Sequence, residues 1–437
     1  MKKYGNRRAM GERTPVIVDG ARSAFVKSFG VFQNCDSLEL YSRVVDGLIR
    51  KVDVDPNAID ELSCGVVIPQ TKNTNVARDT VINLGLPPHI HGYTLNRACT
   101  SSLHTVADAV KSISFGQHDV ILAGGVECLS DVPIVYSRAA RKFLLSLSKS
   151  RTTSAKMKTI STFSPKDWVP SPPGLSEPLT GFTMGEHAEM MAKINGISRE
   201  DQDQFALRSH RNAASAHKAQ KFSDEIVTIW SPPNYNQHID ADNLVREDTN
   251  LESLSKIRPA FDRKYGSITA GNASALTDGA AVTMIADQQR AKELGLTPKA
   301  KVKDFCFVGV QPHPQLLLGP AIAIPLLLKQ NNLTLDDIDL FEIHEAFAAQ
   351  VLSCIKLMDS KDFMEQHFGD SSAFGLVPDN KLNINGGAIA LGHPFGATGS
   401  RLITTMTQEL HRSDKNLGVI AICAAGGMAA AMLIERI

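Results

Sequence analysis

Cys99 stands where a cysteine side chain can become a nucleophile. It lies in NRACTSS, directly before the helically spaced LHTVADAV, and Thr100, Ser101 and Ser102 are suitable helix-capping residues. The partial positive charge at a helix N-terminus favours the thiolate, which is the reactive form of a thiol. A neighbouring imidazole would strengthen this activation. The alternative is a small buried cysteine that only fills the core.

His393 is the candidate base for such a thiol. It lies in NGGAIALGHPFGATGS, a loop whose glycines allow sharp turns and close approaches. These glycines are Gly386, Gly387, Gly392, Gly396 and Gly399. An imidazole titrates near physiological pH, so it can take a proton from a thiol. The alternative is a hydrogen-bonded structural histidine beside a phosphate-binding loop.

Two further candidates follow apolar, strand-like segments. Cys423 ends VIAIC and precedes AAGG, while His344 and Glu345 follow DLFEI. In α/β proteins the carboxyl ends of strands commonly carry the reactive groups. Taken alone, Cys423 could equally be a core thiol and His344 a structural histidine.

A repeated pattern indicates which elements position these groups. NRACTSS is followed by the helix-like LHTVADAVKSISFG and the strand-like DVILAGG, ending near Gly125. NGGAIALGHPFGATGS is followed by the helix-like RLITTMTQELHRS and the strand-like LGVIAICAAGG, ending near Gly427. A similar strand closes each copy, GAAVTMIA after Asp278 and GMAAAMLIE after Gly426. The pattern predicts an internally duplicated α/β architecture, with sheets covered by helices on both faces.

Composition is that of a soluble globular protein. The 437 residues are 43% hydrophobic, and 46 basic side chains balance 46 acidic ones, so charge indicates no nucleic-acid partner. The seven cysteines are scattered without a CxxC pair, so we expect neither disulfides nor a metal site, and the cytoplasm is favoured. Residues 1–13 lack the apolar core of a signal peptide and are expected to form a surface tail. Leu417–Ile434 carries no charge, but Gly426 and Gly427 divide it into two buried strands rather than a membrane span.

A long insertion, about Ser130 to Ile257, interrupts the first copy of the pattern. It contains the Pro-rich SPKDWVPSPPG and the helix-like SREDQDQFALRSHRNAASAHKAQ, and we expect it to form a loop domain. Residues 132–166 include no acidic residue. Their basic residues are Arg138, Arg141, Lys142, Lys149, Arg151, Lys156, Lys158 and Lys166. Such blocks are typical of interaction surfaces.

Taken together, these segments resemble the thiolase family. From VIVDGARSAF near Val16 to the C-terminal AAAMLIE, the family's motifs occur in order: NRACTSS, LAGGVECLS, TMGEHAEMMA, RPAFDRKYGSITAGNASALTDGAA, HEAFAAQ, NINGGAIALGHPFGATGSR and CAAGGMAAAM. The resemblance implies an α/β thiolase fold, a duplicated five-layered αβαβα sandwich with an inserted loop domain. It divides the chain into an N-terminal half, residues 1–129 completed by 258–288, a loop domain at 130–257, and a C-terminal half at 289–437.

The resemblance also implies a role for each candidate. Cys99 matches the acyl-accepting nucleophile, His393 the base that activates it and the incoming CoA thiol, and Cys423 the second, acid/base cysteine. His393 and His344 would stabilise the enolate oxyanion, and the backbone amides of Cys99 and Ala425 the tetrahedral one. The chain departs from the common pattern where HEAF replaces NEAF and CAAGG replaces CIGGG. The backbone amide of Ala425 is retained, so we expect the chemistry to survive.

HEAF together with CAAGG is most similar to the thiolase subunit of the fatty-acid β-oxidation trifunctional complex, including its bacterial anaerobic type. This implies cleavage of 3-oxoacyl-CoA by a second CoA to acetyl-CoA and a shortened acyl-CoA, with CoA as substrate and no cofactor. Met184, Ala270 and Ser274 match CoA-binding positions. The implied partners are a second copy of the chain and a hydratase/3-hydroxyacyl-CoA dehydrogenase subunit. The basic segment 132–166 could meet that partner, a membrane surface or the CoA phosphates.

The sequence leaves three alternative functions open. One is an acetoacetyl-CoA thiolase working in the condensing direction. Another is a decarboxylating ketoacyl synthase, which usually lacks the second cysteine. The third is a catalytically silent lipid carrier on the same fold, which would be expected to have lost Cys99 or His393.

Overall fold

Strands from both halves of the chain meet in one hydrogen-bonded sheet. The computed structural model describes residues 13–169 and 176–437, so most of the expected surface tail and part of the Pro-rich segment lie outside the described residues. The strand order is β10-β11-β12-β9-β1-β8-β5-β3-β4, with β2 paired to β8. The strands are β1 (Pro15–Arg22), β2 (Val26–Lys27), β3 (Glu61–Gly65), β4 (His91–Leu95), β5 (Val120–Cys128), β8 (Thr277–Asp287), β9 (Ala300–Gly309), β10 (Leu340–Ile343), β11 (Leu417–Ala424) and β12 (Met428–Arg436). A separate pair is formed by β6 (Ile229–Trp230) and β7 (His238–Ile239).

The sheet consists of two halves joined by a short antiparallel contact. Val16 pairs with Lys301 and Ile17 with Ala300, which links β1 of the first half to β9 of the second. All the other pairings connect strands within one half. The two halves therefore share a backbone hydrogen-bond ladder as well as a core.

Helices cover both outer faces and fill the space between the halves. Three hydrophobic clusters separate the layers: one beneath the outer helices of the first half, one around α3 and α14, and one beneath the outer helices of the second half. The outer helices are α1 (Ser37–Val52) and α2 (Val76–Asn83) on the first half, and α10 (Pro320–Gln330) and α11 (Ala348–Met358) on the second. The central helices are α3 (Ser101–Ser114) and α14 (Thr398–Arg412). This order of layers is the αβαβα sandwich expected from the sequence. Shorter helices are α9 (Gln288–Glu293), α12 (Lys361–Phe368) and α13 (Ala388–Leu391).

The predicted duplication is present, but one strand ends later than the sequence predicts. Helix α3 leads into β5 as α14 leads into β11, and each of these strands pairs antiparallel with a closing strand, β8 or β12. Strand β5 does not end near Gly125 but continues to Cys128. In the second half, Gly426 and Gly427 have φ values of 80° and 66° and form the turn between β11 and β12. Leu417–Ile434 thus forms paired buried strands, as predicted, and no helix in the described ranges is long and apolar enough to cross a bilayer.

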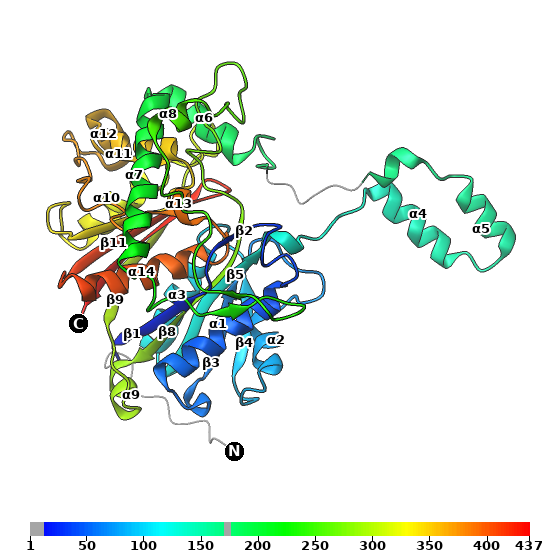
Figure 1. Cartoon of the computed structure of the whole chain (residues 1–437), viewed down its shortest axis with the longest axis horizontal. Helices are drawn as coiled ribbons and strands as arrows, with labels where there is room; N and C mark the ends of the chain where they lie inside the picture. Colours follow the sequence, from blue (N-terminus) through cyan, green and yellow to red (C-terminus); the bar gives the residue numbers. More distant parts are fainter. Residues whose placement is uncertain (1–12, 170–175) are drawn as a thin grey trace.

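The insertion consists of two distinct parts. Helices α6 (Met184–Asn195) and α7 (Arg199–Lys218) pack on the C-terminal half, and the short α8 (Leu251–Ser255) follows them. Helices α4 (Arg138–Lys149) and α5 (Thr153–Ile160) instead form a hairpin that projects away from the body (Figure 1). The boundaries assigned to this loop domain, 130 and 257, stay a prediction.

A buried ion cluster ties the insertion to the first half. Arg22 at the end of β1 donates from Nε to Glu225 at 2.8 Å. Its two terminal nitrogens donate to the Asp242 carboxylate at 2.7 and 2.9 Å. All three side chains are buried. The bidentate geometry explains how a guanidinium is accommodated in the core.

Candidate catalytic site

The structure brings Cys99 and His393 into direct contact. His393 Nε2 lies 3.3 Å from Cys99 Sγ, although 294 residues separate them in sequence. Cys99 lies in the turn between β4 and α3, and His393 lies in the loop before α14. Because α3 and α14 pack against each other, their N-terminal ends carry the two groups to one place. Cys99 is partly exposed, whereas His393 is buried.

The turn that carries Cys99 is stabilised differently from the sequence prediction. Thr100 is the N-cap of α3 but makes no capping hydrogen bond, and its hydroxyl donates instead to the Arg97 carbonyl at 2.7 Å. Ser101 Oγ donates to the Ala98 carbonyl at 2.6 Å. Ala98 itself has a φ of 46°, a left-handed conformation that is uncommon for a residue with a Cβ. The hydroxyls therefore fold back and hold a tight turn immediately before the thiol.

Thr398 determines which nitrogen of His393 faces the thiol. Its hydroxyl donates to the Pro394 carbonyl at 3.2 Å and lies 2.7 Å from His393 Nδ1. A hydroxyl that donates to a carbonyl accepts from its other neighbour, so Nδ1 carries the hydrogen. The lone pair of Nε2 then points at Cys99, which is the arrangement a base requires. The sequence analysis did not single out Thr398.

Burial favours the neutral forms of both Cys99 and His393. Burial raises the pKa of Cys99 to about 12, although backbone amides oppose this effect. Burial, together with the charge of Arg401, lowers the pKa of His393 to about 3. Desolvation therefore opposes the thiolate that the helix terminus favours. Proton transfer from sulfur to imidazole must accompany attack on a substrate.

Two backbone amides point at the sulfur of Cys99. The N–H groups of Ala425 and of Cys99 itself are the hydrogen-bond donors that lower its pKa. Ala425 lies in the turn that follows β11, and the next amide, that of Gly426, donates to Glu177 at 2.9 Å. Two convergent amides form the geometry that stabilises an oxyanion beside a nucleophile.

His344 lies against His393 with unused hydrogen-bonding capacity. The two ring centroids are 4.0 Å apart, and neither ring nitrogen of buried His344 has a partner among the described residues. Burial, with His393 and Arg401 nearby, lowers the pKa of His344 well below its usual range. A neutral imidazole retains one N–H, which His344 can offer to a substrate oxygen.

Glu345 fixes the HEAF segment against the glycine-rich loop. Its carboxylate accepts from Ser209 Oγ at 2.6 Å, Asn383 Nδ2 at 2.7 Å and the Ile389 amide at 3.2 Å. A Cβ at Gly387 would lie only 2.3 Å from the Glu345 carboxyl carbon. Glycine at this position is therefore needed for close approach to the carboxylate.

Glu127 of the first half likewise holds the glycine-rich loop in place, and the sequence analysis did not single it out. Its carboxylate accepts from the amides of Val67 and Ile68, both at 3.0 Å, and from Gly396 of the His393 loop at 3.1 Å. Burial raises its pKa to about 7. An acidic residue inside the apolar VILAGGVEC was the available signal, because buried carboxylates require partners.

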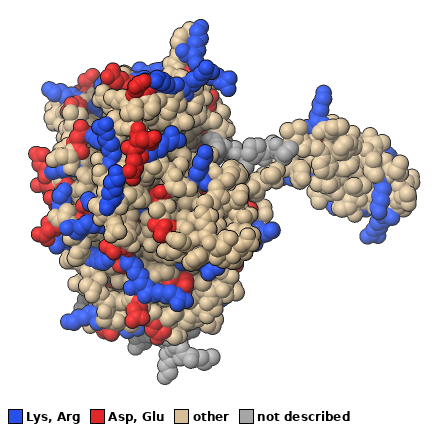
Figure 2. All heavy atoms as spheres, in the orientation of Figure 1, with Lys and Arg blue, Asp and Glu red and all other residues tan. Residues whose placement is uncertain are grey.

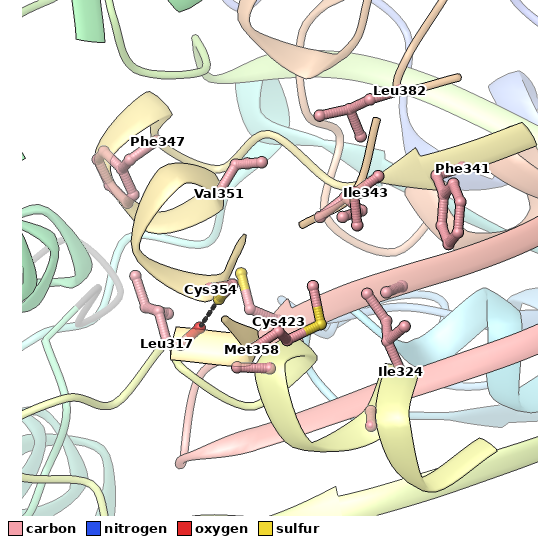
Figure 3. Close-up of a cluster of buried hydrophobic side chains, with 14 of the residues drawn as sticks. Leu317, Ile324, Phe341, Ile343, Phe347, Val351, Cys354, Met358, Leu382 and Cys423 are labelled. Carbon is pink, nitrogen blue, oxygen red and sulfur yellow. Dashed lines mark hydrogen bonds between the residues drawn. The ribbon is translucent and has the colours of Figure 1, made fainter. Parts of the chain in front are cut away.

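Cys423 is a close but enclosed neighbour of Cys99. It is 1% exposed at the end of β11, within the apolar cluster that includes Cys354 of α11 (Figure 3). Burial raises the pKa of Cys423 well above its usual range, and the nearby thiols of Cys99 and Cys354 add to this effect. Cys423 is therefore a protonated thiol within electrostatic reach of the candidate nucleophile.

The proposed CoA-binding residues lie on segments around these loops. Ser274 donates from its amide and its hydroxyl to Ala346 of HEAF, at 3.0 and 3.1 Å. The adjacent Ala275 accepts from the His393 amide at 3.2 Å. Ala270 is exposed on the same segment, and Met184 begins α6 and packs on the C-terminal core.

Comparison with known proteins places this geometry in a family. Residues 15–289 match the family described as "Thiolase, N-terminal domain", and residues 296–436 match "Thiolase, C-terminal domain". A "3-ketoacyl-CoA thiolase" of Photobacterium profundum is 41% identical over 425 residues, covering 97% of each chain. A protein of the same description from Yersinia enterocolitica is 42% identical over 419 residues, covering 96% of each chain. Among solved structures, that of the Bacillus anthracis acetyl-CoA acetyltransferase aligns with a TM-score of 0.83 at 32% identity, covering 98% of this chain and all of the other.

Proposed function

The chain belongs to the thiolase family and is an acyltransferase, and on that premise we propose that it cleaves 3-oxoacyl-CoA (3-ketoacyl-CoA) with a second CoA. The products are acetyl-CoA and an acyl-CoA shortened by one acetyl unit, as in fatty-acid β-oxidation. The observation that carries the proposal is the contact of His393 Nε2 with Cys99 Sγ at 3.3 Å, with the lone pair aimed at the sulfur.

The first half-reaction forms an acyl-enzyme on Cys99. His393 takes the thiol proton as the sulfur bonds to C3 of the substrate. The C2–C3 bond then breaks, and its electron pair leaves on the enolate of acetyl-CoA. The thiol of Cys423 donates a proton to C2 and releases acetyl-CoA. The raised pKa of the buried Cys423 thiol suits this role, because the thiol still carries its proton when the enolate forms.

The second half-reaction restores both cysteines. The incoming CoA thiol gives its proton to the Cys423 thiolate rather than to His393, which already holds the proton of Cys99. The CoA sulfur then attacks the thioester carbonyl. As the tetrahedral adduct collapses, Cys99 leaves as a thiolate and recovers its proton from His393. Each proton returns to its donor, so the cycle needs no cofactor.

Different donors serve the two oxyanions of this cycle. We assign the N–H groups of Cys99 and Ala425 to the tetrahedral adduct, because both already converge on the sulfur. We assign the N–H of His344 and the protonated His393 to the enolate oxygen. The unpartnered nitrogens of His344 support this assignment, since a buried donor without a partner is costly unless the substrate supplies one.

Thiolysis assays with short, medium and long 3-oxoacyl-CoA test the proposal directly. Mass spectrometry of the protein mixed with substrate in the absence of CoA should show an acyl adduct on Cys99. Absence of the adduct together with full activity in Cys99→Ala would disprove the assignment. Condensation of acetyl-CoA, measured with the same preparations, tests the alternative of an acetoacetyl-CoA thiolase that works in the condensing direction.

We assign CoA binding to Ser274, Ala270 and Met184. Ser274 lies on the segment that is hydrogen-bonded to both the HEAF loop and the His393 loop, so a ligand held there would reach the thiol pair. A bulky replacement, Ala270→Leu, should raise KM for CoA esters and leave kcat largely unchanged, because it obstructs binding rather than chemistry.

We assign a membrane-docking role to the α4–α5 hairpin. Seven of the eight basic residues of segment 132–166 lie in the hairpin, and the segment contains no acidic residue. Figure 2 shows Lys and Arg but no Asp or Glu on the visible face of the hairpin. Large apolar side chains are also exposed there: Ile134, Leu144, Leu145, Met157, Ile160 and Phe163. Basic residues near anionic lipid each contribute about 1 kcal/mol, and exposed apolar side chains can insert beside them.

Flotation with phosphatidylserine-containing vesicles tests this role. Deletion of Ser137–Lys166 should abolish flotation and leave cleavage of acetoacetyl-CoA intact. If the deleted protein still floats, the hairpin is not the docking element. A homodimer, a hydratase/3-hydroxyacyl-CoA dehydrogenase partner and a cytoplasmic location are proposed from family resemblance, and co-purification with such a subunit tests the second.

A further inference from the structure

Two histidines face each other at the end of the first half that lies opposite the cysteine. Strand β4 begins at His91, and the chain reaches Cys99 from its other end. Five strand residues span roughly 17 Å at about 3.3 Å per residue. His91 Nε2 lies 2.9 Å from Nε2 of His118, which precedes β5. Glu61, at the start of β3, completes the cluster.

Polar side chains lie beside the other ring nitrogen of each histidine. Glu61 Oε2 lies 3.4 Å from His91 Nδ1, an ion-pair contact that places the carboxyl group next to this nitrogen. Ser112 Oγ lies 2.7 Å from His118 Nδ1 and donates to Gln117 Oε1 at 3.4 Å. The serine oxygen therefore accepts from His118 Nδ1. When each neutral ring carries its hydrogen on Nδ1, both Nε2 atoms have lone pairs.

Two lone pairs at this separation repel each other unless a cation lies between them. With metal–nitrogen distances of about 2.05 Å, an N···N distance of 2.9 Å corresponds to an N–metal–N angle of about 90°. That angle fits two cis positions of a square-planar or octahedral site better than a tetrahedral one. Ligand histidines are commonly oriented by a carboxylate or hydroxyl on their second nitrogen, as Glu61 and Ser112 do here.

We propose that His91 and His118 are cis ligands of a divalent transition-metal ion of the nickel(II) or copper(II) class, oriented by Glu61 and Ser112. Water fills the other positions, since the side chain of His91 is 56% exposed. In residues 13–169 and 176–437, this is the one group of three His, Cys, Asp or Glu side chains with ligand atoms close enough to share an ion. The ion would tie the start of β4 to the start of β5, far from the reacting sulfur.

Isothermal titration of the tag-free, chelator-treated full chain with Ni²⁺ tests the site. Cysteines are first blocked with iodoacetamide so that thiols do not compete. We expect one equivalent to bind, with affinity reduced at least about tenfold in His91→Ala and in His118→Ala. Glu61→Gln should reduce affinity by about 10- to 100-fold, as loss of an orienting partner does. His89→Ala, which removes an exposed histidine two residues before His91, is the matched control and should bind normally.

Two results would overturn the proposal. The first is that Ni²⁺ does not bind the unaltered chain at micromolar concentration, or binds equally well after removal of either histidine. The second is a ¹⁵N spectrum of the metal-free protein that places a hydrogen on Nε2 of either ring at neutral pH, since the pair would then be an ordinary hydrogen bond. Thiolysis by unblocked protein should be unchanged in all four variants.

Discussion

The helix–strand units α3–β5 and α14–β11 have the same construction but place different chemistry at the same position. The N-terminus of α3 carries the thiol of Cys99, and the N-terminus of α14 follows the loop with the imidazole of His393. Their glycine pairs also differ. Gly125 lies inside β5, where a Cβ would be 2.1 Å from the Gly396 carbonyl, whereas Gly426 forms an open turn.

The difference shows that duplication provides the same backbone geometry in both halves but not the same reactive groups. Packing of the two central helices fixes the distance between equivalent loops, and each half then contributes a group that the other lacks. Neither half alone contains both nucleophile and base, so the candidate site requires both to fold together. Substitutions in each half test this division of labour.

Removal of the sulfur from the first half should have the largest effect. Cys99→Ala should lower the thiolysis rate on the order of 10⁴- to 10⁶-fold, as loss of a nucleophile does elsewhere, with no acyl adduct by mass spectrometry. Cys64→Ala, which removes a buried thiol of β3, is the control and should retain activity. More than a tenth of normal activity in Cys99→Ala would place the nucleophile elsewhere.

The rate of Cys99 alkylation should rise about tenfold per pH unit between about pH 7 and about pH 10, because iodoacetamide reacts with the thiolate. The thiol is protonated until pH approaches its pKa of about 12, which burial raises. His393, with its pKa lowered to about 3, carries no stabilising charge over this range. A rate independent of pH would mean that the first half holds a preformed thiolate.

The stability of the first half should depend on Arg22. Arg22→Ala leaves the buried carboxylates of Asp242 and Glu225 without their guanidinium partner and should cost about 3–5 kcal/mol in urea unfolding. Arg50→Ala, which removes an exposed ion pair with Asp46, should change stability by less than about 0.5 kcal/mol.

The ion pair of Arg22 with Asp242 predicts a pH dependence of stability. Burial alone would raise the pKa of Asp242, but the charge of Arg22 and hydrogen bonds hold it well below its usual range. A depressed carboxyl pKa stabilises the fold above the unfolded value of about 3.9, and the contribution is lost as pH falls through the folded value. The stability difference between the unaltered chain and Arg22→Ala should therefore narrow below about pH 4.

Loss of the Thr398 hydroxyl, which fixes the tautomer of His393 in the second half, should have an intermediate effect on catalysis. Thr398→Val leaves His393 Nδ1 without its acceptor, which costs about 1–3 kcal/mol and should lower kcat/KM by roughly 10- to 100-fold. Thr398→Ser should restore most of the activity. Equal loss in both variants would show that the methyl group, rather than the hydrogen bond, matters.

The two glycine pairs should respond unequally to alanine. Gly426→Ala forces a Cβ into a left-handed conformation with open space around it, which should cost about 1–2 kcal/mol in thermal or urea unfolding. Gly125→Ala should be more harmful and should also impair thiolysis, because it presses on the Gly396 carbonyl in the His393 loop. Equal effects would contradict the difference between the pairs.

Much of the fold could be predicted because the repeat is visible in the chain. The matching segments predicted β8 as the closing strand although the insertion separates it from β5. The end of β5 could not be placed, since Gly124 and Gly125 resemble a turn in sequence, yet are glycines because neighbouring backbones approach closely. Loop motifs located Cys99 and His393, but not the distance between them.

Two residues that sequence reasoning missed act through contacts made only in the folded protein. Glu127 joins segments from distant parts of the chain. Thr398 contacts His393 and Pro394 within its own loop, and neither residue type alone reveals these partners. Sequence reasoning also did not anticipate that burial opposes the thiolate of Cys99, because the surroundings that raise its pKa depend on packing between the halves. Glu61, His91 and His118 likewise share no motif and meet only through the register of β3, β4 and β5.

The short ladder between β1 and β9 limits how a bulky ester can enter the molecule. Rotation of one half against the other would break the pairing of Val16 with Lys301 and separate the central helices. The ladder therefore opposes rotation of one half against the other and helps to hold the thiol and the imidazole at their spacing. Admission of substrates of different length therefore depends on the inserted segment, whose helices α6 and α7 pack on the C-terminal half. Mutations that alter chain-length preference should lie in this segment.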